Sequence, residues 1–145
     1  MRTVIDTGVA VSAVLLSRSV PRQAFDAAAV RGKLLVSEAT VAELDEVLRR
    51  PKFNKYVSEE IRLEFLAALV QEAEQVEVTE VITACRDGKD NKFLELAVSG
   101  GASHIITGDE DLLLLHPFRG IAVLAPQAFL ASLSASGDPQ SALRR

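Results

Sequence analysis

The chain has 145 residues, of which 48% are apolar and 25% are charged. This balance predicts one globular domain and excludes disordered and low-complexity proteins. The formal net charge is −4, which excludes binding to nucleic acid through bulk charge, so that any such role would need a local site. The longest apolar stretch, residues 9–16, is far shorter than the roughly 20 residues that span a bilayer. A single cysteine, Cys85, cannot form an internal disulfide, and we expect a cytoplasmic protein without a membrane partner.

Short apolar runs alternate with helical patterns along the chain. In order, we predict a strand at 3–5, helices at 8–16 and from 21, a strand at 33–36, helices from 37 to near 51 and from 58, a strand at 76–78, a helix at 90–98, a strand at 104–107, a leucine-rich helix from about 111, a strand at 121–124 and a helix at 126–133. This alternation predicts a three-layer α/β/α domain with a mostly parallel, five-stranded sheet. We expect residues 1–133 to form the domain and residues 134–145 a flexible tail.

Two carboxylates follow predicted strands. Asp6 comes directly after strand 3–5, and Asp109 follows strand 104–107 and Gly108. Ligands of an open parallel sheet bind beyond the carboxyl ends of its strands, where the strand order reverses, so both side chains are candidates for a functional site. Each could instead cap the helix that follows it, because aspartate is a favoured N-cap residue. Thr107 offers a hydroxyl beside them.

Asp90 lies at the start of a predicted helix. It precedes Phe93 and Leu94 by three and four residues and therefore stands above the apolar stripe of its own helix. A carboxylate in that place is costly unless it is paired or liganded, although capping of the helix is an alternative. Asp87, three residues earlier, fits an exposed turn.

One more acidic residue flanks an apolar stripe. Glu43 lies on one side of the stripe of the helix from residue 37, and Asp45 lies on the other side, so periodicity does not choose between them. If Asp6, Glu43, Asp90 and Asp109 reach one crevice, their charges repel and each raises the pKa values of the others. A hard divalent cation, Mg²⁺ or Mn²⁺, relieves this repulsion and suits an all-oxygen site.

Four segments resemble motifs of the PIN domain, a nuclease fold, and within it the bacterial toxin-component branch related to VapC. The segments are VIDT at 4–7, SEATVAELDEVL at 37–48, DGKDNKFLELA at 87–97 and ITGDEDL at 106–112. They occur in the family's order, and the resemblance covers residues 2–133. It implies the strand order 3-2-1-4-5. It also implies acidic site residues at Asp6, Glu43, Asp90 and Asp109, a further metal-binding acid at Asp111 and a supporting hydroxyl at Thr107.

The resemblance implies hydrolysis of single-stranded RNA with Mg²⁺ or Mn²⁺, giving 5′-phosphate and 3′-hydroxyl products. It also implies a small antitoxin protein as partner, and many members of the branch form homodimers. One departure is Gly8, which stands where the first motif usually has asparagine. The alternative is therefore a non-catalytic module of the same fold that binds RNA or a protein and has a degraded metal site.

A group of cations follows the helix from residue 37 and is the best candidate for contact with RNA outside the pocket. This cation cluster comprises Arg49, Arg50, Lys52 and Lys55, interleaved with Phe53 and Tyr56. The alternative is structural, because cations at the carboxyl end of a helix complement its dipole and the two rings can simply pack.

Overall fold

The computed structural model describes residues 1–135, in which strands and helices alternate. The strands are β1 (Arg2–Ile5), β2 (Lys33–Val36), β3 (Glu74–Gln75), β4 (His104–Ile106) and β5 (Ala122–Leu124). The helices are α1 (Thr7–Leu15), α2 (Val20–Arg31), α3 (Glu38–Leu48), α4 (Glu59–Glu72), α5 (Asn91–Ser99), α6 (Glu110–Leu113) and α7 (Pro126–Ala135), with 3-10 turns η1 (Pro51–Phe53) and η2 (Gly88–Asp90). The sheet order is β3-β2-β1-β4-β5 and all its pairings are parallel. The predicted fold class and strand order are confirmed.

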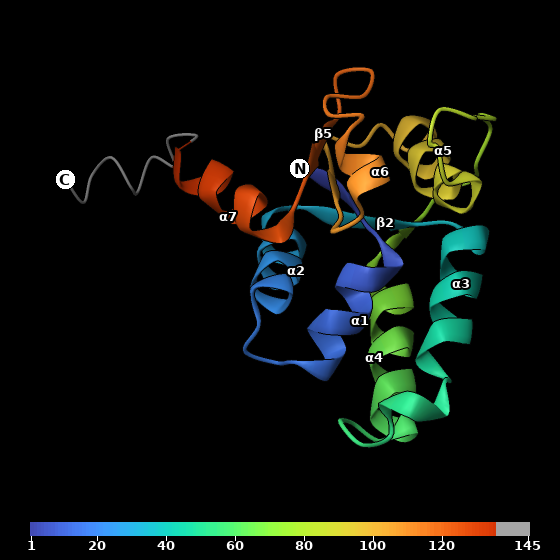
Figure 1. The fold of residues 1–145 in the computed structure, drawn as a ribbon, viewed down its shortest axis with the longest axis vertical. Coiled ribbons are helices and arrows are strands. Elements are labelled where there is room, and N and C mark those ends of the chain that lie inside the picture. The colour runs from blue at the N-terminus through green and yellow to red at the C-terminus, as the bar shows by residue number, and fades with distance from the viewer. Residues whose placement is uncertain (136–145) are drawn as a thin grey trace.

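Helices cover both faces of the sheet (Figure 1). Helices α1, α2 and α7 share one apolar cluster with the sheet, which includes Val9, Ala28 and Phe129. Helix α5 and the short α6 cover the opposite face. Helices α3 and α4 pack beside α1 through a third cluster, in which Leu48 is fully buried. Because α1 contacts both α2 and α3, it connects the covered sheet to the helical pair α3–α4.

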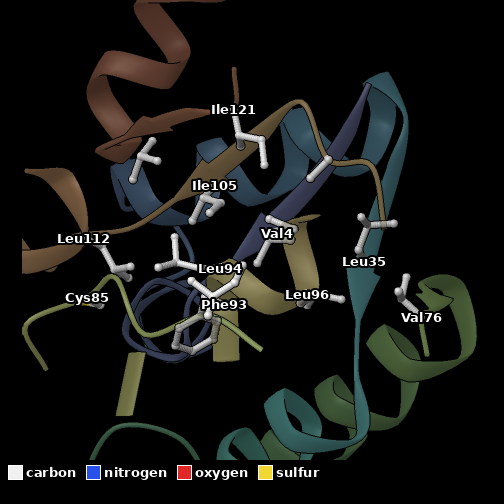
Figure 2. Packing of buried hydrophobic residues seen from close by; sticks show 14 residues of the cluster. Val4, Leu35, Val76, Cys85, Phe93, Leu94, Leu96, Ile105, Leu112 and Ile121 are labelled. Carbon is white, nitrogen blue, oxygen red and sulfur yellow. The ribbon is translucent and has the colours of Figure 1, made fainter. Parts of the chain in front are cut away.

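The core between the sheet and α5 is built from alternate residues of the central strands. Figure 2 shows Val4 of β1 and Ile105 of β4 close to Phe93 and Leu94 of α5. The four residues are at most 2% exposed. Since neighbouring residues of a strand point to opposite faces, Ile106 packs on the other side with α2 and α7. Burial on both faces explains the continuous apolar runs of these strands.

The predicted strand at 76–78 is wrong, because β3 is Glu74–Gln75. The pairing of β2 with β3 ends at Val36 and Gln75, and Ser37 then caps α3. The Val76 N–H still donates to the Val36 carbonyl at 2.8 Å, but β2 offers the following residues no partner. Apolar content alone therefore placed the strand too late.

Other boundaries differ slightly from the predicted ones. The predicted leucine-rich helix is the four-residue α6, and α5 begins at Asn91 after the η2 turn. Helix α7 ends at Ala135, two residues beyond the predicted end of the domain, and the remainder of the predicted tail, 136–145, lies outside the described residues. Within residues 1–135, no helix has the length and apolar character needed to cross a membrane.

Candidate functional site

The register of β1 and β4 places the first two site residues together. Ile5 pairs with Ile106, so that Asp6 and Thr107, which follow them, lie side by side at the carboxyl end of the sheet. The Asp6 N–H donates to the Ile106 carbonyl at 3.0 Å, and the Thr107 hydroxyl donates to Oδ2 of Asp6. The strand order reverses between β1 and β4, which is where open α/β sheets bind ligands.

Asp6 both caps a helix and faces the site. Its Oδ1 accepts from the Val9 N–H at 2.8 Å and thereby caps α1. The residue is only 6% exposed, and this burial raises the pKa of Asp6. The hydrogen bonds from Thr107 and Val9 lower the pKa but do not outweigh the burial. The capping alternative and the functional one are therefore compatible for this carboxylate.

Asp109 is the matching residue after β4. Its Oδ1 accepts from the Asp111 N–H at 2.8 Å, which caps α6. Its own N–H donates to the Thr107 hydroxyl at 3.0 Å, so this one hydroxyl contacts both strand-end aspartates. Thr107 is fully buried and fixes their relative positions.

Asp90 differs from both, because its side chain makes no capping hydrogen bond to α5. The capping alternative is wrong for this residue. Its Oδ2 is buried and has no hydrogen-bond partner within the described part of the chain. Burial, followed by the charge of Asp109, raises the pKa of Asp90 to about 7. A carboxyl group with a buried oxygen that lacks a hydrogen-bond partner in residues 1–135 is suited to a cationic ligand.

Glu43 extends from the middle of α3 toward the same place. Its Oε2 accepts from the Thr7 hydroxyl at 2.6 Å, and its Oε1 lies 3.3 Å from the Lys92 ammonium. Asp45, in contrast, forms an ion pair with Arg49 at 3.0 Å. The structure thus separates the two acidic residues that periodicity left equivalent, and only Glu43 turns to the site.

These four carboxylates line one pocket of about 340 Å³. Its lining residues are Asp6, Thr7, Gly8, Glu43, Asp90, Phe93, Gly108 and Asp109. Within residues 1–135, no three acidic, histidine or cysteine side chains form a ready-made metal cage. The fit to Mg²⁺ or Mn²⁺ therefore rests on the donor chemistry: oxygen ligands only, an excess of negative charge, and one buried carboxylate oxygen that has no partner in the described part of the chain.

Two predicted features lie apart from this pocket. Asp111 is not among the lining residues, and its carboxylate pairs with Arg86 at 2.7 Å. In the cation cluster, Arg49 pairs with Asp45, and Arg50 pairs with Glu46 at 2.9 Å. The cluster surrounds η1, which follows the carboxyl end of α3. Figure 1 shows this end of α3 at the lower end of the molecule. Contact with RNA there stays a prediction.

A buried arginine that the sequence reasoning missed supports this turn. Arg62 of α4 is fully buried, and its guanidinium donates to three backbone carbonyls and one side-chain amide. The acceptors are Leu48 at 2.7 Å, Val57 at 2.5 Å, Arg50 at 3.3 Å and the side chain of Asn54 at 3.0 Å. Its position on one stripe with Leu66 and Leu69 (i, i+4, i+7) was an available signal, because a charged residue on a buried stripe needs partners.

The raised pKa of Asp90 predicts a pH-dependent stability. Below pH 3.8, the ordinary pKa of an aspartate, the Asp90 carboxyl is protonated in both the folded and the unfolded chain. Between pH 3.8 and about 7 only the unfolded chain releases this proton. Raising the pH over this range therefore lowers the free energy of unfolding. We expect Asp90→Asn to unfold at nearly the wild-type temperature at pH 4 and at a higher temperature at pH 8. Thermal unfolding in EDTA checks this, with Asp87→Asn as the control. A difference that is constant from pH 4 to pH 8 would contradict it.

Comparison with known proteins gives the class of the fold. A family model of the PIN domain matches residues 2–111, and the chain belongs to the PIN-domain family. It is similar to a crystal structure of VapBC2 from Rickettsia felis bound to a DNA fragment from their promoter. The TM-score is 0.57 and the identity 13%, over 85% of this chain and 97% of that chain, so the likeness shows the fold alone. No curated protein matches the sequence. PIN domains are generally nucleases, which supports a hydrolase.

Proposed function

We propose that the chain is a divalent metal-dependent endoribonuclease that cleaves single-stranded RNA, and that it is the toxin component of a toxin–antitoxin pair. The observation that carries this proposal is the convergence of Asp6, Glu43, Asp90 and Asp109 on one pocket, with Oδ2 of Asp90 buried and without a hydrogen-bond partner among residues 1–135. Family membership supports hydrolysis of a phosphodiester. RNA as the substrate and the need for Mg²⁺ or Mn²⁺ follow from the resemblance and from the oxygen-only donor set.

In this mechanism Asp6, Asp90 and Asp109 would hold the ion. An Mg²⁺ or Mn²⁺ ion held there would supply Lewis-acid activation of water and charge neutralisation at the phosphodiester. The hydroxyl of Thr107 orients Asp6 and contacts the backbone of Asp109. Gly108 lines the pocket, and a Cβ at this position would meet no atom of residues 1–135 within 4 Å, so the backbone here is open to an approaching phosphate.

The test is cleavage of a fluorogenic single-stranded RNA by the wild-type chain and by Asp90→Asn, each with Mn²⁺ and with EDTA. Cleavage that needs both the metal and Asp90 supports the proposal. Absence of cleavage by the wild type, or cleavage that the variant shares, contradicts it. The first of these outcomes favours the non-catalytic binding module, for which Gly8 is the specific observation.

Gly8 also allows a direct test of the departure from the family motif. A side chain at this position has room, because within the described residues a Cβ would meet only Asp6 Oδ1, at 3.8 Å. We expect Gly8→Asn to fold and to bind Mn²⁺ roughly tenfold more tightly, since a hydrogen bond that orients a metal-binding carboxylate is worth about tenfold or more in metal affinity. Titration calorimetry measures this, with Gly8→Ala as the matched control. Equal affinities of the two variants would show that the missing amide has no effect on the site.

The proposed partner is a small antitoxin that covers the acidic pocket, and a homodimer and a cytoplasmic location belong to the same proposal. Support comes from the resemblance to the VapC-related branch and from the structural neighbour, which is a VapBC2 assembly. The antitoxin of such a pair is normally encoded beside the toxin, so a small neighbouring reading frame is the first place to look for it.

A further inference from the structure

Lys92 is a cation at the rim of the acidic pocket to which no role has yet been assigned. It lies in the first turn of α5, and its ammonium reaches across to α3, 3.3 Å from Glu43 Oε1. The same ammonium donates to the Lys89 carbonyl at 2.5 Å and lies 5.6 Å from the centre of the Phe93 ring. Glu43 and Phe93 both line the pocket, so three contacts fix this cation beside it.

The ion pair is distinctive within the described part of the chain. Among the ion pairs formed by residues 1–135, only Lys92–Glu43 involves a carboxylate of the pocket lining. The side chain of Lys92 is 22% exposed. It lines the neighbouring hollow between α3 and α5, and its contacts Glu43 and Phe93 line the acidic pocket. An ion pair that stays in contact with solvent contributes little to folding, and stability alone is a weak reason for a lysine here.

The remaining donor capacity of the ammonium points to a ligand. A lysine ammonium has three N–H donors, and the two hydrogen-bonding contacts above, to Glu43 and to the Lys89 carbonyl, use two of them. That leaves a third donor for an anion bound beside Glu43 and Phe93. Lysine binds phosphate as a point charge, and a phosphodiester is the anion that the proposed reaction brings to this pocket.

We propose that Lys92 is a substrate-binding residue of this site, donating its third N–H to a non-bridging oxygen of the RNA phosphate. Glu43 is then the positioning residue for Lys92, because both its carboxylate oxygens are already engaged, by Thr7 and by Lys92. The inference rests on the proposed function and deepens it: three aspartates face the metal, and Lys92 holds the phosphate.

The test compares wild type, Lys92→Met, Lys92→Arg and Lys89→Met in RNA cleavage with Mn²⁺ between 50 and 200 mM salt. Lys89 is exposed and forms no ion pair among residues 1–135, so Lys89→Met removes the same charge from the same segment without touching the pocket. Far-UV circular dichroism and thermal unfolding establish that each variant folds.

For Lys92→Met we expect KM to rise roughly tenfold or more, as fits the loss of one charge-assisted hydrogen bond, and kcat to change less than KM. The slope of log KM against log salt concentration should fall by about 0.7, the value for one lost phosphate contact on a single strand. Lys92→Arg should restore most of the binding, and Lys89→Met should keep KM within about twofold of wild type.

Three outcomes overturn the inference, in distinguishable ways. If the wild type cleaves RNA and Lys92→Met keeps the wild-type KM and salt slope, Lys92 does not bind the phosphate, and the proposed function stands. A drop in kcat alone, with KM and slope unchanged, also overturns it, because Lys92 then acts through Glu43. If the wild type cleaves no RNA, the proposed function fails and this inference fails with it.

Discussion

Replacing Asp90 with asparagine is expected to lower kcat/KM for single-stranded RNA by at least about a thousandfold. Stabilisation of transition-state charge by a bound divalent ion is worth several kcal/mol, and about 4 kcal/mol corresponds to three orders of magnitude in rate. Asp90 carries a large share of this effect because its Oδ2 is the buried pocket oxygen without a partner in residues 1–135. An amide has nearly the same shape but carries no charge for the ion.

The matched control is Asp87→Asn. Asp87 is exposed and accepts from the Lys89 N–H at 3.0 Å in the η2 turn, so its replacement removes one acid from the same segment but none from the pocket lining. We expect this variant to stay within a few-fold of wild type. If Asp90→Asn cleaves as fast as Asp87→Asn, Asp90 does not belong to the catalytic site.

Replacing Arg62 with methionine is expected to lower the free energy of unfolding by about 3–5 kcal/mol. Methionine fills a similar volume but donates no hydrogen bond, so four acceptors around a fully buried side chain lose their donor. An unsatisfied buried acceptor costs roughly 1–3 kcal/mol. Removal of a buried charge offsets part of this cost.

Urea denaturation at neutral pH measures the effect, and Arg49→Met is the matched control. The Arg49 side chain is 53% exposed and its ion pairs with Asp45 and Glu59 lie at the surface, so its loss should cost less than about 1 kcal/mol. Equal stabilities of the two variants would mean that the Arg62 hydrogen bonds contribute nothing net to the turn around η1.

Periodicity and strand-end positions predicted most of the fold, because a doubly covered sheet leaves apolar runs that local rules recognise. The error at β3 has a long-range cause: the length of that strand is set by where β2 ends, at Val36, and by the cap of α3 at Ser37. The two valines further along the chain, Val76 and Val78, contain no information about either boundary.

The residues of the candidate site could likewise be predicted only in part. Asp6 and Asp109 could be predicted from their place after strands, whereas the choice of Glu43 over Asp45 needed the resemblance. The ion pair of Lys92 could not be predicted, because its partner is 49 positions away, and only the packing of α5 beside α3 brings the two together. Side chains whose function depends on one distant contact leave no local pattern.

The hydrogen bond from Thr107 to Asp6 joins residues 101 positions apart, and this separation has a consequence for the protein during its synthesis. Asp6 leaves the ribosome long before β4 does, and until β4 pairs with β1 it has neither Thr107 nor Asp109 beside it. The pocket is therefore completed only when β4 has emerged. A ribosome that has not yet released β4 carries no finished acidic pocket, and a product that stops before β4 lacks the pocket altogether.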